Sequence, residues 1–577
     1  MAETDQQFSP VDGLEGLNAT TNSTTNGTVT SSILANLQDV NFILLEAKII
    51  FGAMGIIYLG AHAALRRPPS AAPPKSKKTG KTRRDEDRFS QGLERSDAIM
   101  FPLMAAGILV GLYYLIQWLK DPAIINKILQ YYMSFMSIAS LLTLYAHGIE
   151  FFTGLVFPRF WKRKDGGILR VNQKRRLAVR CDEGGNEIAT PTSASDASPL
   201  PGVLGLLAPS ARLRNLVWDI RDLLTKRWTF RFFAHGIADE KAKFKFAHVL
   251  ALSLALASAG IYFSTTSPLL SNLLGYGMCY GSMLLLSPTD FVTGALVLVG
   301  LFVYDIVMVF YTPYMVTVAT TLDVPIKLTF KAAAHKSILG LGDIVLPGML
   351  MGWTLRFDLW LHYLHKIKYE STDLKIVAKD EASGQVITKS DTKHKEVKMP
   401  YVDVTGRWGE WLWSGGLTSF GQRLPLELAA TQFSKTYFYA SLVGYLLGML
   451  TTLAMLLVYK RGQPALLYLV PGVLGSILVT ALARGDLPEL WKYTEDGSLD
   501  TEDVVVDLDG QGKAVKSLGH VENGVLDTTK SKDGKDKEQK EKTEKEDKKK
   551  EDEKAVADKK RRHQVLMVSI EALEDSD

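Results

Sequence analysis

Residues 291–318 read FVTGALVLVGLFVYDIVMVFYTPYMVTV, a stretch long and apolar enough to cross a bilayer as a helix. Tyrosines aside, its single ionisable side chain is Asp305, near the middle. A carboxylate is costly in lipid, so we expect Asp305 to be functional and to have a partner. The next apolar stretch, residues 337–354, reads SILGLGDIVLPGMLMGWT and contains one acid, Asp343. The two stretches predict neighbouring spans that each carry one carboxylate.

The composition of the chain indicates its broad class. Of its 577 residues, 46% are hydrophobic and 22% are charged. The apolar residues form blocks of about 18–28 residues, the length of a transmembrane helix, and strongly charged blocks separate them. This segregation is typical of a polytopic helical membrane protein and excludes one large soluble core. Only two cysteines occur, Cys181 and Cys279, so we expect no disulfide framework and no cysteine-based metal site. We expect no other metal and no cofactor.

The apolar stretches predict the fold. The fold class expected is all-α, a polytopic membrane protein with about nine transmembrane helices. The expected spans cover about residues 42–65, 98–119, 125–146, 246–263, 269–286, 291–318, 337–354, 436–458 and 464–483.

The charge distribution predicts the orientation of these spans. Residues 1–41 contain no Lys or Arg and carry three glycosylation sequons, at Asn18, Asn22 and Asn26. Residues 66–95 hold ten basic residues against four acids. Because basic loops stay cytosolic, we expect a lumenal N-terminus and, after nine spans, a cytosolic C-terminus. The N-terminus lacks the basic start of a secretory signal peptide. An unmodified cytosolic arm is the alternative.

Three polar regions accompany the spans. Residues 158–245 hold eighteen basic and nine acidic residues, which favours contact with anionic lipid over nucleic acid. Their aromatic and basic segment 214–233 predicts an amphipathic helix at the membrane interface. Residues 356–435 form a second, lysine-rich insert. The tail, residues 486–577, is rich in Lys, Glu and Asp, so it is predicted to be disordered, with a solvated helix as the alternative.

The chain therefore divides into seven regions. They are a lumenal arm (1–41), the first three spans (42–157) with a basic cytosolic linker (66–96), a basic cytosolic insert (158–245), four spans with both aspartates (246–355), a second cytosolic insert (356–435), two final spans (436–485) and the charged tail (486–577).

The two aspartates predict a specific chemistry if their spans pack together. Two carboxyls a few Å apart in a poorly solvated site cannot both be ionised, so one keeps a proton while the other stays charged. Such a pair can activate water and protonate a leaving amine. Gly340 and Gly342 remove bulk beside Asp343 and let another backbone approach. The alternatives are an Asp305 that only joins helices through hydrogen bonds, and glycines that serve packing alone.

A third motif opens the last span. Residues 463–471 read QPALLYLVP, with prolines at Pro464 and Pro471. A proline at the start of a helix is unremarkable alone. Two prolines around a short apolar run leave backbone groups without helical partners, and these groups require protein or water nearby inside a membrane.

These motifs carry a family resemblance. YD at 304–305, GLGD at 340–343 and QPALLYLVP at 463–471, in this order, resemble the GxGD-type intramembrane aspartyl proteases, and most closely signal peptide peptidases. The resemblance implies a presenilin-like fold and a fungal origin. It implies a catalytic pair in Asp305 and Asp343, active-site support from Tyr304, Gly340, Leu341 and Gly342, and a substrate-positioning PAL element made of Gln463, Pro464, Ala465 and Leu466.

The resemblance also implies a function. Family members cleave type II-oriented transmembrane helices, such as signal-peptide remnants, in the endoplasmic reticulum membrane, without a cofactor. Expected partners are such substrates, the lipid bilayer, quality-control or ubiquitin-ligase components of membrane-protein turnover, and further copies of the chain in a homo-oligomer; nucleic acid is not expected. The short connection between the aspartate spans and the sequons disfavour presenilin itself.

Three alternatives to this function stay open. A related protease of another compartment would share the motifs. A proton-coupled transporter would also use buried acids, although it would show internal repeats, and no second YD-like or GLGD-like block occurs. A non-catalytic quality-control scaffold would bind helices without cutting them.

Overall fold

The structure is a computed structural model. It describes residues 40–74, 91–119, 122–163, 167–182, 187–188, 197–234, 238–265, 267–322, 327–332, 335–379, 386–414, 425–459, 463–500, 504–508, 514–522, 525–527 and 566–572. The predicted sequons at Asn18, Asn22 and Asn26 lie outside these residues, as does most of the charged tail.

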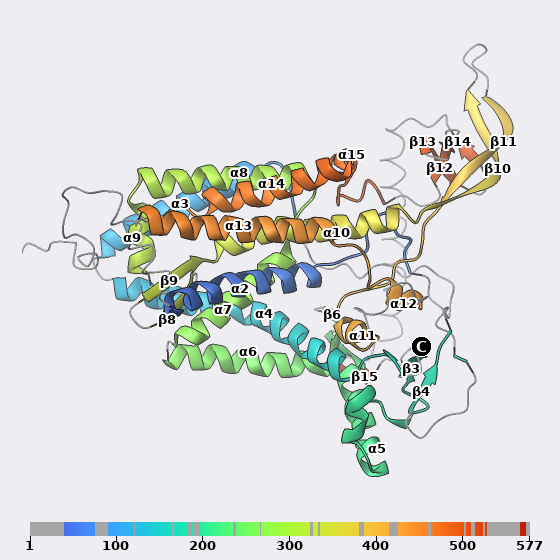
Figure 1. The fold of residues 1–577 in the computed structure, drawn as a ribbon, viewed down its shortest axis with the longest axis horizontal. Helices are drawn as coiled ribbons and strands as arrows, with labels where there is room; N and C mark the ends of the chain where they lie inside the picture. Colours follow the sequence, from blue (N-terminus) through green and yellow to red (C-terminus); the bar gives the residue numbers. More distant parts are fainter. Residues whose placement is uncertain are drawn as a thin grey trace, which may run out of the picture.

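Helices dominate the described residues and form one bundle (Figure 1). Its members are α2 (Val40–Ala63), α3 (Asp97–Leu119), α4 (Pro122–Val156), α6 (Phe246–Thr265), α7 (Pro268–Leu285), α8 (Phe291–Ile306) with η3 (Val307–Tyr311) and α9 (Tyr314–Thr321), α10 (Gly342–Leu364), α13 (Thr436–Tyr459) and α14 (Leu466–Arg484).

The predicted polytopic helical fold is confirmed. Seven stretches in the described part of the chain are long and apolar enough to cross a membrane. Helices α7 and α10 occupy the other two expected positions but are less apolar; Arg356 and Asp358 lie in the second half of α10. The number of nine spans therefore stays a prediction.

The bundle has two different ends. The elements of both long inserts gather at the end where α4 and α10 finish, which we call the insert end (Figure 1). At the opposite, short-loop end, successive helices are joined by brief connections and by the hairpin of β8 (Lys327–Ala332) and β9 (His335–Gly340). Side chains from α10 are buried on all sides from Pro347 to Leu361, so α10 runs through the centre of the bundle.

The stretch around Asp305 is not the single helix that its hydropathy predicts. Helix α8 ends at Ile306, one residue after Asp305, and continues as the π-helical turn η3. The backbone becomes extended at Thr312 (φ −132°, ψ 147°) before Pro313 and α9. Proline disfavours helical geometry in the residue before it, which explains the break. π-Helical turns often occur at functional sites.

The predicted span at 337–354 begins and ends elsewhere. Its first residues form β9, which pairs antiparallel with β8, and the helix starts only at Gly342. The helix then continues to Leu364, so the second insert starts later than residue 356. Burial explains the longer helix: Arg356 and Asp358 find polar partners inside the bundle, which hydropathy alone does not anticipate.

The first insert contains strands as well as a helix. The predicted amphipathic helix at 214–233 is partly wrong: α5 covers Ala211–Thr225, and the following residues form the strand β5 (Arg227–Ala234). The sequence RWTFRFFA is rich in aromatic residues, which favour strands. This local preference explains why the segment forms a strand although its mixture of aromatic and basic residues predicted a helix. β5 lies between β6 (Ala238–Lys245) and β15 (Leu566–Ala572) in a three-stranded sheet.

Smaller elements complete the insert end. They are β1 (Gln91–Leu93) with β7 (Leu286–Pro288); β2 (Phe160–Lys162), β3 (Ile168–Asn172) and β4 (Leu177–Arg180); η2 (Gly202–Leu207), α11 (Trp408–Trp413) and α12 (Leu426–Ala429); and a closed barrel of β10 (Lys368–Lys379), β11 (Val386–Val397), β12 (Val504–Leu508), β13 (Ala514–Glu522) and β14 (Val525–Asp527).

The prediction that the tail, residues 486–577, is disordered is wrong for much of the part that the structure describes, which contains α15 (Leu487–Lys492) and the strands β12–β15. Helix α15 follows α14 directly, and Tyr493 is 2% exposed. The next residues rejoin the bundle, because Glu495 donates its backbone N–H to the carbonyl of Thr289 at 2.8 Å. The highly charged composition of the tail as a whole gave no indication of this short ordered segment.

Candidate active site

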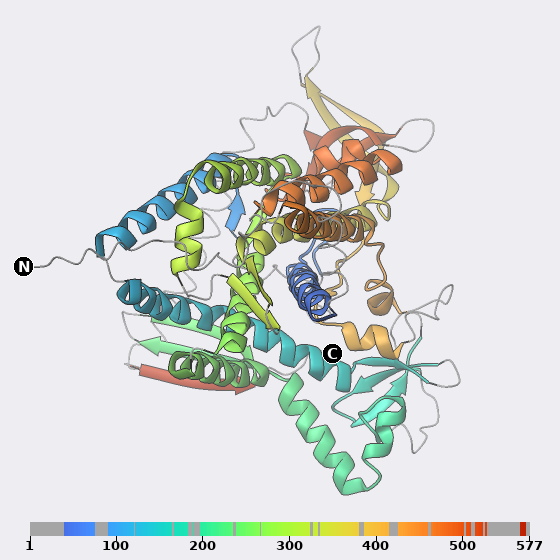
Figure 2. The ribbon, with the colours of Figure 1, turned by 60° about the vertical axis from the view of Figure 1, so that its left-hand side comes forward.

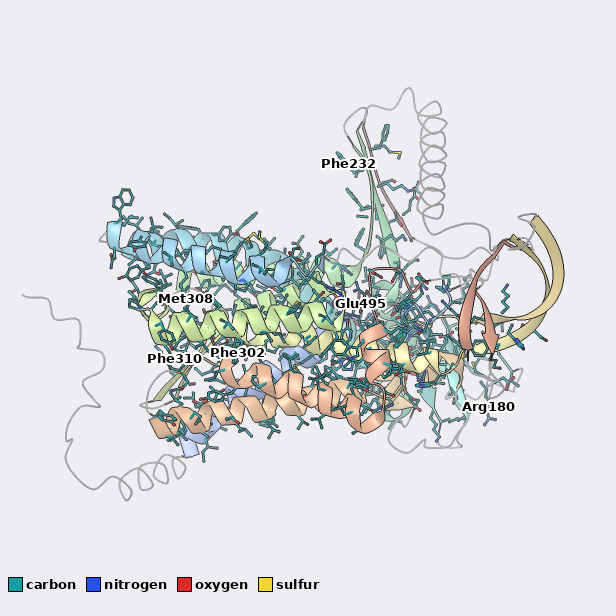
Figure 3. The ribbon with its side chains drawn as sticks, turned by 90° about the horizontal axis from the view of Figure 1, so that it is seen from above. Arg180, Phe232, Phe302, Met308, Phe310 and Glu495 are labelled. Carbon is teal, nitrogen blue, oxygen red and sulfur yellow. The ribbon has the colours of Figure 1, made fainter. Side chains whose placement is uncertain are left out.

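Asp305 lies near the end of α8 and is 4% exposed. Phe302 and Met308, which flank it along the chain, lie toward the short-loop end of the bundle (Figure 3). Its Oδ2 accepts a hydrogen bond from the backbone N–H of Leu466 at 3.2 Å. This bond brings two of the predicted site residues together, from spans that are far apart in sequence.

The start of α14 explains why this bond forms. The first N–H groups of a helix have no partner within it, and the end carries a partial positive charge. No side chain next to Leu466 in the sequence caps α14, because its N-cap residue is Ala465 and the residue before it is Pro464, and neither side chain has a hydrogen-bond acceptor. The carboxylate of Asp305 therefore serves as the cap from another helix. The PAL element thus presents a helix start to Asp305.

Close packing of α13 and α14 holds this helix start in place. A Cβ on Gly444 would lie 2.3 Å from the carbonyl oxygen of Gly472, so only glycine allows the two backbones to approach. Small residues at such crossings are typical of helices packed in membranes.

Asp343 lies in the first turn of α10, directly after the β8–β9 hairpin. Its carboxyl is packed against Gly340, where an added Cβ would lie 3.1 Å from Oδ2 of Asp343. The side of Gly342 is more open, since the nearest atom to an added Cβ is 3.9 Å away, in Leu346. Gly340 is therefore the glycine that lets the chain turn closely around the acid.

The structure brings the two acids into one site. The carboxyls of Asp305 and Asp343 lie close enough for the charge of one to act on the other. Asp305 is buried, whereas Asp343 is partly exposed and Gly342 beside it is exposed. The site therefore has a closed side at α8 and an open side at the start of α10.

Tyr445 on α13 is a site residue that the sequence reasoning missed. It is fully buried, and its hydroxyl donates a hydrogen bond to the backbone carbonyl of Asp343 at 3.3 Å. A tyrosine in an apolar span carries no motif, so only the fold could reveal this contact. Tyr445 fixes the backbone that presents the second acid.

Other predicted residues have supporting positions. Tyr304 is half-buried against the core, and Leu341 accepts the backbone N–H of Val345 at 2.9 Å at the start of α10. The carbonyl of Ala465 accepts backbone N–H groups from the first turn of α14. Gln463 is half-buried just before that turn.

A second carboxylate, Asp358, caps a helix start in the same way. Its Oδ1 accepts the backbone N–H of Tyr437 at 3.2 Å, and its Oδ2 accepts that of Phe438 at 3.0 Å, both in the first turn of α13. Asp358 is 5% exposed, and Arg484 and Lys435 act on it electrostatically.

A buried ion cluster joins the end of α10 to the anchored tail segment. Nε of Arg356 contacts Oε1 of Glu495 at 2.7 Å, Arg66 pairs with the other oxygen, and Tyr493 donates to Oε1 at 2.8 Å. Burial alone would raise the pKa of Glu495, but the guanidiniums of Arg356 and Arg66 outweigh it and leave the pKa below its ordinary value. Figure 3 shows Glu495 at the insert end, away from Phe302 and Met308, which flank Asp305 along the chain.

The donor set of the site suits proton transfer. In the described part of the chain, no group of three or more His, Cys, Asp or Glu side chains is arranged to hold a metal ion. The groups that converge on the site are two carboxyls, a helix start and a tyrosine hydroxyl. This arrangement can take up and deliver protons at a bond held between the acids.

Comparisons with known proteins identify relatives of this chain. A family model described as signal peptide peptidase matches residues 84–497. A probable intramembrane protease of Saccharomyces cerevisiae is 25% identical over 71% of this chain and 62% of its own length. A probable intramembrane protease of Schizosaccharomyces pombe is 30% identical, with 45% and 68% covered. The human signal peptide peptidase is 29% identical, with 43% and 50% covered.

The matched part is thus about half to two thirds of each relative's length. No solved structure matches the chain. The family model covers both aspartates and the PAL element, and it extends over most of the chain. The chain belongs to the signal peptide peptidase family.

Proposed function

We propose that this protein is an intramembrane aspartyl endopeptidase. It cleaves type II-oriented transmembrane helices, such as signal-peptide remnants, in the endoplasmic reticulum membrane. The observation that carries the proposal is the meeting of Asp305 and Asp343 at one site, where the start of α14 is hydrogen-bonded to the first acid. The names of the relatives, intramembrane protease and signal peptide peptidase, support the same activity.

The reaction uses the two carboxyls in opposite protonation states. The ionised carboxyl takes a proton from a water molecule, whose oxygen attacks the scissile carbonyl. The protonated carboxyl donates to the carbonyl oxygen, which gives a gem-diol intermediate. A proton then passes to the leaving nitrogen as the C–N bond breaks, and the products are a carboxylic acid and an amine. Water reaches the acids from the open side, at Asp343 and Gly342.

The substrate must present an extended backbone to the acids, because a helix shields its carbonyls. The sequence suggests Pro464–Leu466 as the segment that binds such a strand, but the N–H of Leu466 is already bonded to Asp305. The β8–β9 hairpin is better suited. The side-chain amide of Asn272 occupies the outer edge of β8, with both hydrogen bonds to Thr329 at 2.8 Å.

This arrangement leaves β9 as the strand available for pairing. Among the residues that the structure describes, β9 pairs only with β8, and it ends at Gly340, three residues before Asp343. An unwound substrate that adds to β9 would reach the acids directly. The β-addition that we propose therefore places the scissile bond by main-chain hydrogen bonds, while side chains contribute selectivity.

The distribution of basic residues supports the orientation that we propose. The insert end carries the basic loops and is placed in the cytosol, so the N-terminus is lumenal. In this orientation the inserts and tail are available to quality-control or ubiquitin-ligase components, and the enzyme takes part in membrane-protein turnover.

The test is a cleavage assay with the full-length protein purified in detergent. A fluorescent signal peptide is incubated with the wild type, Asp305→Asn, Asp343→Asn and the surface control Asp219→Asn, with and without a transition-state analogue of aspartyl proteases. We expect cleavage by the wild type and the control, abolished by the inhibitor and by either active-site variant. Binding of the peptide without any cleavage would instead identify a non-catalytic scaffold and overturn the proposal.

A further inference from the structure

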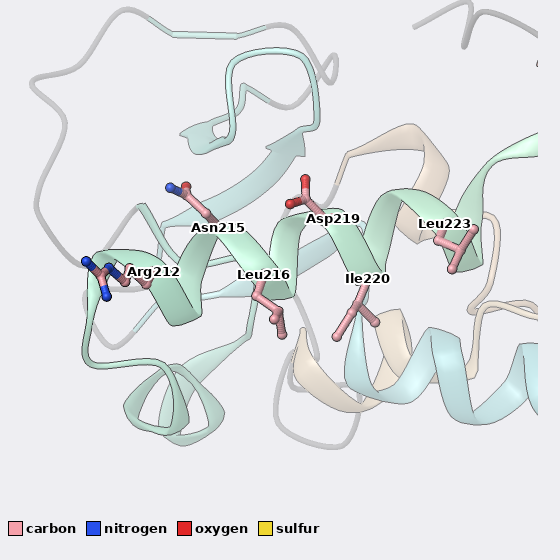
Figure 4. Close-up of a pocket in the computed structure, with 6 residues that line it drawn as sticks. All are labelled: Arg212, Asn215, Leu216, Asp219, Ile220 and Leu223. Atoms are coloured by element: carbon pink, nitrogen blue, oxygen red, sulfur yellow. The ribbon is translucent and has the colours of Figure 1, made fainter.

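Helix α5 has an apolar stripe that faces away from the protein. Leu213, Leu216, Ile220 and Leu223 recur every three or four residues and are 45%, 54%, 41% and 42% exposed. Figure 4 shows Leu216, Ile220 and Leu223 at one surface pocket of α5, which the polar residues Arg212, Asn215 and Asp219 also line.

The opposite side of α5 is firmly attached to the first insert. The indole N–H of Trp218 donates to the carbonyl of Ala197 at 3.0 Å, and Trp218 is 1% exposed. The buried guanidinium of Arg221 donates to Oε1 of Gln173 at 2.5 Å. These contacts fix the orientation of α5 about its own axis, so that the leucine stripe faces outward.

The sheet that follows α5 also has an apolar face. Its register places Phe230 beside Ile570 and Phe232 beside Val568, and Trp228 continues the same face. Val568 and Ile570 are 56% and 60% exposed. On the other face of β5, Thr229 is 8% and Phe233 is 5% exposed.

The position of the sheet relates this face to the membrane. Strand β6 ends at Lys245, and the span α6 starts at Phe246 without a linker. Lys245 also pairs with Glu150 near the end of α4, at 2.9 Å. Figures 2 and 3 show that the sheet projects from the bundle across the direction of its helices. The sheet thus lies at the level where two spans leave the bilayer, and parallel to its surface.

We propose that α5 and the β5–β6–β15 sheet together form an interfacial element that lies on the bilayer surface at the insert end. The leucine stripe and the face of Trp228, Phe230, Phe232, Val568 and Ile570 enter the boundary between headgroups and acyl chains. Aromatic and aliphatic residues next to basic ones are typical of such elements. Nζ of Lys226 lies 5.8 Å from the Trp228 ring, which places a basic group beside this aromatic face for contact with phosphate groups.

Continuity with α6 favours lipid over a protein partner as the occupant. A protein bound to this face would have to fit between the sheet and the membrane surface, into which the adjacent helix already enters. The element also ties the chain near its far end, through β15, to the membrane beside α6. Binding of this element to the membrane does not depend on the catalytic activity.

Site-directed spin labelling of the full-length protein tests the proposal. Single cysteines replace Val568, Ser569, Ile570 and Glu571 on β15, and Leu216, Asp219 and Ile220 on α5. The native Cys181 and Cys279 are both buried, so the labelled wild type measures the background. The proteins are reconstituted in phosphatidylcholine vesicles, and the accessibility of each nitroxide to oxygen and to a water-soluble nickel chelate is measured.

We expect the ratio of oxygen to nickel-chelate accessibility to alternate along β15. It should be severalfold higher at 568 and 570 than at 569 and 571, and likewise higher at 216 and 220 than at 219. Uniform water-like values would overturn the proposal. Protection of 568 and 570 from both reagents would also overturn it, because it would show a protein partner on this face. Ile188→Cys, at an exposed position of the same insert, is the aqueous reference; unchanged elution of each variant on size exclusion controls for folding.

Discussion

Asp305 and Asp358 occupy two comparable positions in this bundle and have different surroundings. Each is about 5% exposed, and each accepts backbone N–H groups at the start of a helix that belongs to another part of the chain. Asp358 uses both oxygens to cap α13 and has Arg484 and Lys435 nearby. Asp305 uses one oxygen to cap α14, and its charged neighbour is another acid, Asp343.

The difference shows what separates a structural carboxylate from a reactive one. Both oxygens of Asp358 accept backbone hydrogen bonds, and its charged neighbours among the described residues are the cations Arg484 and Lys435. In the described structure, Asp305 has one backbone donor and lies near a group that competes with it for negative charge. A proton can therefore move between Asp305, Asp343 and a third molecule. Both Asp305 and Asp358 cap a helix start, so capping does not distinguish them. Their charged neighbours do.

The largest expected effect separates the two aspartates by activity. Asp305→Asn keeps an acceptor for the N–H of Leu466 but cannot exchange a proton, so peptide cleavage should fall by about 10⁴-fold with the fold retained. Asp358→Asn should keep most of the turnover per folded molecule. Initial rates with a fluorescent signal peptide, normalised to folded protein, measure both. Near-normal cleavage by Asp305→Asn would remove the distinction between the two sites.

Glu495, whose charged partners in the described structure are the cations Arg356 and Arg66, extends the comparison. Glu495→Gln leaves Arg356 and Arg66 without their anion, and should lower the stability by about 3 kcal/mol. Because the folded pKa of Glu495 lies below its ordinary value of 4.5, its stabilisation is present above that value and is lost as the pH falls through the folded pKa. Thermal melting from neutral to acidic pH measures this, with Glu489→Gln on α15 as the control. An equal acid sensitivity of wild type and Glu495→Gln would contradict it.

Alanine substitutions at the two capping positions should lower the stability in the opposite order to the effects expected on activity. Asp358→Ala removes two bonds to a charged acceptor and should cost about 2 kcal/mol of stability, whereas Asp305→Ala removes one and should cost about 1 kcal/mol or less. Melting of the purified proteins in the same detergent compares them. If Asp305→Ala were the less stable variant, capping would be the main role of Asp305.

The smallest expected effect concerns the glycines beside the second acid. Gly340→Ala places a Cβ 3.1 Å from Oδ2 of Asp343 and should reduce turnover by about 10-fold through displacement of the carboxyl. Gly342→Ala meets only Leu346, at 3.9 Å, and should have a smaller effect. The ratio of the two rates is the measurement. If Gly342→Ala lost more turnover than Gly340→Ala, then Gly342, and not Gly340, would be the glycine that allows the close packing around Asp343.

Much of the fold could be predicted from composition. Helices lie at the positions of all nine predicted spans because long apolar runs have no other stable form in lipid. Helix boundaries were less predictable. Pro313 breaks the Asp305 stretch and β9 replaces the start of the next one, since local backbone preferences and strand pairing decide at this scale. The anchored segment around Glu495 was also missed, because its partners are more than 100 residues away in sequence.

The sequence by itself determined that two acids lie in adjacent membrane-spanning stretches and that a proline-flanked motif opens a later one. Hydropathy and residue type are local properties, and they are readable without neighbours. Only the tertiary structure decided that the N–H of Leu466 meets Asp305, that Tyr445 supports Asp343, and that Asp358 is a cap with cations rather than an acid with a partner. A carboxylate takes its role from the charges and donors around it, and packing between distant helices brings these together.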